Sequence, residues 1–156
     1  MATICKASAM TERKLKNIFI HGPIVASFIG DSIHKHSSKT EIGGHSIFLG
    51  QVRADMIDEK KVLVIEYTTY EEMALEKMDT IRQEIFAKYD LNCMHVYHSL
   101  GKVKAGEISL FVFTSSAHRK AAIDACNETV ERIKVELPVW GKEIFIDETY
   151  QWKVNN

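Results

Sequence analysis

Cysteine is scarce in this chain, and long apolar runs are absent. The 156 residues include three cysteines, Cys5, Cys93 and Cys126, and no two of them have C-x-x-C spacing. An odd number of widely spaced cysteines argues against a disulfide framework and favours a reducing compartment, so we expect a cytoplasmic protein. No apolar run approaches the roughly 20 residues of a membrane span, and the N-terminal stretch lacks the apolar core of a secretory signal.

An excess of charge of either sign is also missing. The chain has 20 basic and 21 acidic residues, a formal net charge of −1. It therefore has no global attraction to nucleic acid or to an anionic membrane, and any anion-binding site must be local. No repeat, low-complexity tract or linker divides the sequence. We expect one domain over residues 17–156, long enough to bury a core, after a flexible polar tail over residues 1–16.

The sequence does contain short apolar strands that alternate with amphipathic helices. Strands are predicted at residues 17–24, 45–53, 61–68, 93–101, 107–116 and 142–149. A short helix is predicted after Gly22-Pro23. This mixture of strands, helices and hairpin-length links favours an α+β sandwich, with a mainly antiparallel sheet and helices on one face. The central β-α-β-β-α-β order resembles a ferredoxin-like plan.

Two longer helices carry the strongest helical patterns. The first follows Thr69 and Glu72, which have capping-box spacing. Its buried face should consist of Ala74, Met78, Ile81 and Ile85. The second runs from near Ala117 to Pro138, because proline ends a helix. Its buried stripe should consist of Ile123, Cys126, Val130, Ile133 and Leu137.

Three basic residues crowd the predicted start of the last helix. His118, Arg119 and Lys120 lie where free N–H groups and the helix dipole already supply positive charge. A bound phosphate would resolve this conflict, since backbone N–H groups and side chains could hold it together. The alternative is that the side chains simply point into water. Arg53, which follows Gly50 at a strand end, becomes more interesting if it converges on these residues.

Two lysines flank the Pro-Val-Trp turn near the end of the chain. Lys134 follows the buried Ile133, so its stem can lie along apolar surface while its ammonium reaches a cleft. Lys142 comes at the start of the last predicted strand. A free lysine has a pKa near 10.4, and burial or nearby cations would lower that pKa and activate the amine. The alternative is two solvated surface lysines.

A metal site is not expected, although the chain has seven histidines. His34 and His36 fall in a predicted loop, and His95 and His98 point to opposite faces of a predicted strand. Neither pair has an obvious carboxylate or thiolate companion. Nucleotide-binding, hydrolase-elbow and zinc-protease motifs are absent from the sequence.

Four segments occur in the order of a known family. They are GGHSIFLGQVR, YEEMA, FTSSAHRKAAIDACNETVERIK and LPVWGKEIF. Together they resemble the large, catalytic subunit of molybdopterin synthase, the MoaE family, over about residues 18–152. The resemblance implies an α/β-hammerhead fold with an added β-rich part.

The resemblance also implies an activity and its partners. Members convert cyclic pyranopterin monophosphate into molybdopterin by inserting two sulfurs as a dithiolene. The sulfur arrives as a thiocarboxylate on the C-terminal glycine of a small ubiquitin-like subunit. The large subunit dimerises and binds one small subunit at each end, which gives a heterotetramer. We expect this sulfurtransferase activity with no cofactor bound.

Site residues follow from the resemblance position by position. Lys134 resembles the family's essential lysine at the point where the small subunit's tail enters. His118 and Arg119 resemble a pair that binds the substrate phosphate across the dimer interface. The remaining substrate-binding positions are Gln51, Val52, Arg53, Gly141, Lys142 and Glu143.

The sequence departs from the family pattern at the second active-site lysine. Without a gap, that lysine falls on Gly141, and Lys142 is the next basic position. Neighbouring residues in a strand point to opposite sides, although glycine could allow a local twist that re-aims Lys142. Ser99 and Thr68 also replace a common arginine and glutamate. These departures leave one alternative open, a catalytically impaired scaffold that only binds the ubiquitin-like partner.

Overall fold

The computed structural model describes residues 14–155, so most of the predicted N-terminal tail lies outside the described residues. Three helices are present in this range: α1 (Ala26–Lys35), α2 (Glu71–Lys88) and α3 (Arg119–Glu136). The strands of this range are β1 (Phe19–His21), β2 (Gly44–Gln51), β3 (Met56–Ile57), β4 (Lys60–Thr69), β5 (Cys93–Lys104), β6 (Ile108–Ser116), β7 (Val139–Phe145) and β8 (Tyr150–Trp152).

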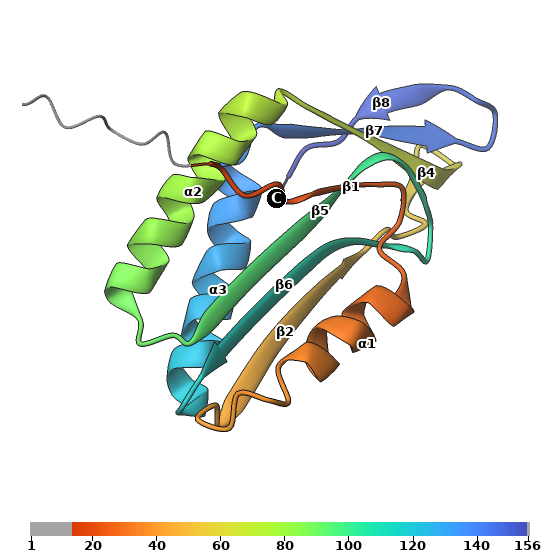
Figure 1. Ribbon diagram of the computed structural model, residues 1–156. Helices are drawn as coiled ribbons and strands as arrows, with labels where there is room; N and C mark the ends of the chain where they lie inside the picture. Colours follow the sequence, from red (N-terminus) through yellow and green to blue (C-terminus); the bar gives the residue numbers. More distant parts are fainter. Residues whose placement is uncertain (1–13, 156) are drawn as a thin grey trace, which may run out of the picture.

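The strands form one sheet in the order β2-β6-β5-β4-β7-β8. All neighbours along this path are antiparallel, whereas β1 pairs with β5 in parallel. Strand β5 joins two parts of the sheet, because it pairs with β6 through His98 and with β4 from Gly101 onward. Gly101 has a φ of +77°, which favours glycine, at this change of partner. The structure confirms the mainly antiparallel α+β fold (Figure 1).

Helices α2 and α3 pack on one face of β5 and β6 and form the main core. The predicted stripe of α2 is confirmed, since Ala74, Met78, Ile81 and Ile85 are all buried. Burial of such aliphatic side chains stabilises the fold by about 1.5–3 kcal/mol each. Helix α1 instead lies across the opposite face, where Ile24 and Ile29 contact Phe111 and Phe113. A smaller core between β4, β5 and β7 forms the β-rich part.

Two details of the predicted helices are wrong. Tyr70, not Thr69, is the N-cap of α2, and no side chain caps that end of the helix. The Thr69 hydroxyl donates instead to the carbonyl of Pro138 at 2.6 Å, because Thr69 still belongs to β4 and faces the start of β7. On α3, Ile123 is 52% exposed and does not belong to the buried stripe. Among the described residues, no helix is both long and apolar enough to cross a bilayer.

Candidate active site

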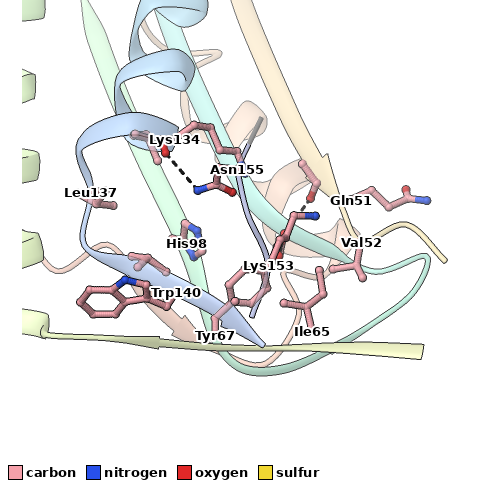
Figure 2. Close-up of a pocket in the computed structure, with 15 residues that line it drawn as sticks. Gln51, Val52, Ile65, Tyr67, His98, Lys134, Leu137, Trp140, Lys153 and Asn155 are labelled. Atoms are coloured by element: carbon pink, nitrogen blue, oxygen red, sulfur yellow. Dashed lines mark hydrogen bonds between the residues drawn. The ribbon is translucent and has the colours of Figure 1, made fainter. Parts of the chain in front are cut away.

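A small pocket lies where the last turn of α3 meets the junction of the two parts of the sheet. Its volume is about 120 Å³. Helix α3 contributes Ile133 and Lys134, β5 contributes His98, and the end of the chain contributes Lys153 and Asn155. Figure 2 shows Lys134, His98, Lys153 and Asn155 arranged around one hollow, with Tyr67 and Ile65 below it. Residues far apart in the sequence therefore converge on this pocket.

Local sequence features bring these elements together. Helix α3 ends at Glu136, and Pro138 turns the chain directly into β7, which pairs with β4 at Val139. This turn leaves Lys134 in the last turn of α3, where the helix dipole favours a cation. The side-chain amide of Asn155 donates to the carbonyl of Lys134 at 3.2 Å. The C-terminal segment is thereby held against the end of α3.

Lys134 and Lys153 give the pocket its charge. The Lys134 residue as a whole is exposed, but protein atoms surround its ammonium group where that group faces the pocket. This burial, and secondly the positive charge of Lys153, lower the pKa of Lys134 from its ordinary value. A lowered pKa increases the neutral fraction of the amine, which is the form that acts as a base or nucleophile.

His98 is a buried histidine in the same pocket. Its Nδ1 lies 2.8 Å from the carbonyl oxygen of Ser99, so Nδ1 carries the proton and Nε2 keeps its lone pair. Burial is the main cause that lowers the pKa of His98 to about 4, and the charge of Lys134 adds to it. At neutral pH His98 is thus an uncharged hydrogen-bond acceptor beside Lys134. The Tyr67 hydroxyl, which donates to Ser109 at 3.2 Å, completes this polar wall.

A wider hollow of about 600 Å³ continues from the pocket toward β2 and β8. Lys134, Lys153 and Asn155 line both spaces, so the two are adjacent. Arg53 and Glu143 line the wider hollow, whereas Gln51 and Val52 line the small pocket. Arg53 also forms an ion pair with Asp55 at 3.2 Å. The predicted sites at residues 51–53, Lys134 and Glu143 therefore lie together.

Lys142 points away from this pocket. Its ammonium forms an ion pair with Glu66 at 2.9 Å and lies 5.0 Å from the centre of the Tyr150 ring. Gly141 does line the pocket, and a Cβ atom added to it would lie 3.0 Å from Ile65 and 3.7 Å from the Cβ of Lys153. A side chain at position 141 would thus enter the space beside Lys153. No local twist re-aims Lys142 in this structure.

His118 and Arg119 lie at the opposite end of α3. They line a separate hollow of about 630 Å³ with Gly43, Lys120 and Ile123. Lys134 follows Arg119 by fifteen positions along α3, a distance of roughly 22 Å at 1.5 Å per residue. Lys120 forms an i,i+4 ion pair with Asp124 at 2.8 Å. Within one chain, the predicted phosphate-binding pair does not reach the Lys134 pocket or Arg53.

Comparison with known proteins assigns the chain to a family. The family model described as "MoaE protein" matches residues 25–136. The chain belongs to the MoaE family. Among curated relatives, the "Molybdopterin synthase catalytic subunit" of Drosophila willistoni is 41% identical over 115 residues, which is 72% of this chain and 31% of that protein. The same-named protein of Drosophila grimshawi is 39% identical over 125 residues, 79% of this chain and 34% of that protein. The chain thus spans about a third of the length of these relatives.

Solved MoaE-family structures share the fold. A crystal structure of molybdopterin synthase from Staphylococcus aureus matches with a TM-score of 0.76 and 29% identity, covering 87% of this chain and 95% of that chain. A complex of subunits 1 and 2 of molybdopterin-converting factor from Helicobacter pylori 26695 matches with a TM-score of 0.73 and 18% identity, covering 86% and 87%. At 18% identity the second likeness shows the fold alone.

Sequence reasoning missed two residues of this pocket, Lys153 and His98. Lys153 follows β8, a three-residue strand too short for its pattern to be seen, and it reaches the pocket because β8 pairs with β7. In the sequence, His98 indicates only a possible metal ligand. Its position one residue after the half-buried Tyr97 does not indicate the Lys134 neighbour, because the two residues meet only through tertiary packing.

Proposed function

We propose that this chain is the catalytic subunit of a molybdopterin synthase. It would transfer sulfur from the C-terminal thiocarboxylate of a small ubiquitin-like subunit to cyclic pyranopterin monophosphate, in the cytoplasm. Membership of the MoaE family and the names of the curated relatives support this activity. The observation that carries the proposal is the convergence of Lys134, His98 and Lys153 with residues 51–53 on two adjoining hollows.

The narrow pocket suits the tail of the partner. A volume of about 120 Å³ admits a slender chain such as terminal glycines but no bulky side chain. Lys134 at its wall would attract the negative thiocarboxylate in its ammonium form, and in its neutral form it could accept a proton during the transfer. As sulfur attacks the pterin, a carbon–sulfur bond forms and a carbon–oxygen bond of the pterin breaks, with the oxygen leaving on the phosphate or as water. Water would then cleave the bond between that sulfur and the acyl carbon of the tail, which releases the partner's tail as a carboxylate. The wider hollow would hold the pterin ring.

Lys153 takes over the role of the family's second lysine in this proposal. The two positions are neighbours in the pocket, because a Cβ atom added at Gly141 would lie 3.7 Å from the Cβ of Lys153. Lys153 also lies 4.0 Å from Glu143, the buried carboxylate of the wider hollow. Its charge lowers the pKa of Lys134 and would stabilise negative charge that develops during transfer. The glycine at position 141 therefore does not imply a lost activity.

The phosphate would be bound by a second copy of the chain. Strand β2 is an edge strand, and Ile47, Phe48 and Leu49 at its centre are exposed by 36–41%. Arg119 lies beside Gly44 at one end of β2, and Gln51 at the other end lines the Lys134 pocket. A two-fold axis at the centre of β2 would bring the Arg119 end of each copy to the Lys134 end of the other. His118 and Arg119 would then hold the substrate phosphate at the start of α3.

A single-turnover assay tests the proposed function. The chain is mixed with a thiocarboxylated small subunit and cyclic pyranopterin monophosphate, and the dithiolene product is detected as its oxidised fluorescent derivative. We expect product from the wild-type chain. We expect Lys134→Ala to lose activity by about 10²-fold or more, because a proton-transfer group is removed, while it still binds the small subunit. Binding without any product from the wild type would identify the chain as a scaffold and overturn the proposal.

A further inference from the structure

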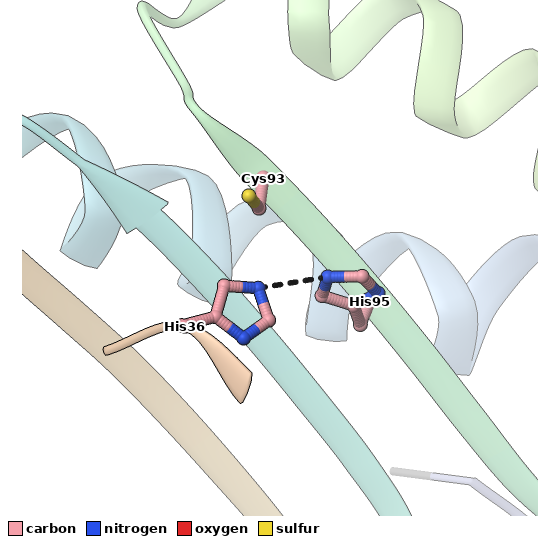
Figure 3. A group of neighbouring side chains, drawn as sticks. All are labelled: His36, Cys93 and His95. Carbon is pink, nitrogen blue, oxygen red and sulfur yellow. Dashed lines mark hydrogen bonds between the residues drawn. The ribbon is translucent and has the colours of Figure 1, made fainter. Parts of the chain in front are cut away.

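A second cluster of reactive side chains lies on the opposite face of the sheet, under the end of α1. His36 is the C-cap residue of α1, and Cys93 and His95 are two residues apart on β5. Residues two apart on a strand share a face, so all three side chains meet there (Figure 3). His36 and Cys93 are buried and His95 is half-buried. The catalytic proposal uses none of these residues.

The spacing of the three side chains matches a metal site. One nitrogen of each histidine and the sulfur of Cys93 all lie within 4.8 Å of one another. The Nε2 atoms of His36 and His95 are 3.1 Å apart. In tetrahedral zinc sites, bond lengths near 2.0–2.3 Å place neighbouring ligand atoms about 3.3–3.6 Å apart. The pair of nitrogens is already close to this separation, and a closure of about 1 Å would bring the sulfur into range.

The surroundings of His36 orient it as a ligand. Its Nδ1 lies 2.7 Å from the carbonyl oxygen of Ser32, which can only accept a hydrogen bond. Nδ1 therefore carries the proton, and Nε2 presents its lone pair toward His95 and Cys93. A backbone carbonyl behind the non-ligating nitrogen is the usual support of a metal-bound histidine. The rings of His36 and His95 also contact Phe113, which limits their rotation.

We propose that His36, Cys93 and His95 bind a thiophilic divalent metal ion, with Zn²⁺ as the best match and water as the fourth ligand. Two imidazoles and one thiolate are ligands that zinc prefers, and three protein ligands leave one open position. The site faces α1, whereas the Lys134 pocket lies at the end of α3 on the other face. Metal binding here is therefore independent of the proposed sulfur transfer.

Two lysines compete with the metal. Lys39 donates a hydrogen bond to the sulfur of Cys93 at 2.9 Å, and Lys16 lies 3.1 Å from Nδ1 of His95. Both lysines are exposed, so each can swing into water when a metal binds. The lysines should weaken binding without preventing it.

Titration with Co²⁺, a spectroscopic substitute for Zn²⁺, tests the site. We expect one ion per chain, with a thiolate-to-cobalt charge-transfer band and the visible bands of tetrahedral Co²⁺. Cys93→Ser should lose the charge-transfer band, and His36→Ala should weaken binding by more than about tenfold. Lys39→Ala should bind Co²⁺ several-fold more tightly, because a competing cation is removed. Weaker Co²⁺ binding in His36→Ala together with tighter binding in Lys39→Ala would distinguish metal ligation from a general effect on folding.

Cys126 provides a matched control. Cys126→Ser should keep the band, since Cys126 is buried on α3 against the other face. Zn²⁺ should also raise the Tm of the wild type but not of Cys93→Ser. Absence of the band at millimolar Co²⁺ in the wild type, or its persistence in Cys93→Ser, would overturn the proposal. If Cys93→Ser fails to fold, two results still decide the question. They are the charge-transfer band of the wild type and the tighter Co²⁺ binding of Lys39→Ala.

Discussion

Lys134, Lys153 and His98 form an unusual electrostatic unit. Two lysines share a small pocket, and the buried neutral His98 can accept a hydrogen bond without adding charge. Like charges and burial both disfavour protonation of Lys134, so its pKa is lowered. A lowered pKa increases the neutral fraction of this amine, which is the form that acts as a base or nucleophile. Lys142 instead forms an ion pair with Glu66 outside the pocket.

Replacing Lys153 or Lys142 by alanine tests which of them acts as the second lysine of the proposed active site. Lys153→Ala should reduce single-turnover sulfur transfer by about 10²-fold, because the group that faces Lys134 is lost. Lys142→Ala is the matched control and should retain nearly full activity, since its side chain lies outside the pocket. Single-turnover rates at saturating small subunit measure both effects. A large loss in Lys142→Ala with normal turnover in Lys153→Ala would reverse the assignment.

Burial of His98 should make the fold sensitive to acid. The unfolded chain binds a proton at His98 near pH 6.5, whereas the folded chain does so only near pH 4. The contribution of neutral His98 to the free energy of unfolding is therefore fully present above pH 6.5 and is lost as the pH drops toward 4. Between pH 7.5 and 5 the free energy of unfolding should decrease by about 2 kcal/mol through this group alone.

Urea unfolding at the two pH values measures this loss of stability. His98→Gln should show a decrease that is smaller than that of the wild type by about 2 kcal/mol. His34→Gln, at an exposed histidine, should behave like the wild type. Equal decreases in the wild type and in His98→Gln would show that His98 is not the cause.

Strand β2 and helix α3 position the functional groups at the scale of elements. Helix α3 carries Arg119 at its start and Lys134 at its end, and β2 runs from Gly44, beside Arg119, to Gln51, which lines the Lys134 pocket. Gly43 is required at this crossing, because an added Cβ atom would lie 2.2 Å from the carbonyl oxygen of Ala117. The free edge and exposed apolar centre of β2 are the features on which the proposed interface between two copies rests.

Disruption of β2 should separate the two copies. Ile47→Lys places a charge at the centre of the proposed interface, where it would be buried without a partner, so we expect a monomer. Phe86→Lys is a matched control, since Phe86 is similarly exposed but lies on α2. Light scattering during size-exclusion chromatography gives the mass of each species. A dimeric Ile47→Lys variant would exclude β2 from the interface.

Most elements could be predicted from the sequence, because the period of the apolar residues shows each strand and long helix. The α2 stripe from Ala74 to Ile85 is an example. The capping box at Thr69 was not found in the structure, because the pairing of β4 with β7 extends through that residue and outweighs the local preference. Lys153 and the His36–Cys93–His95 cluster could not be predicted, since their members meet only through strand pairing and the packing of α1.

At the scale of the whole molecule, the proposed function places two half-sites in one chain. The Lys134 pocket and the Arg119 hollow lie at opposite ends of α3, roughly 22 Å apart, so one substrate cannot touch both in a single chain. A two-fold dimer would join the halves into two complete sites, each built from both copies. This arrangement would also leave the far edge of the sheet, at β8, free for a small subunit on each side.

A heterodimer of two inactive variants tests this central claim most directly. Lys134→Ala and Arg119→Ala chains are co-expressed with different affinity tags, and the doubly tagged dimer is isolated. Each variant alone should be inactive, but the heterodimer should recover about half of the wild-type single-turnover product, because one of its two sites then holds both intact residues. If both residues served the same chain's pocket, both sites would be broken. A heterodimer without activity would therefore contradict the shared site.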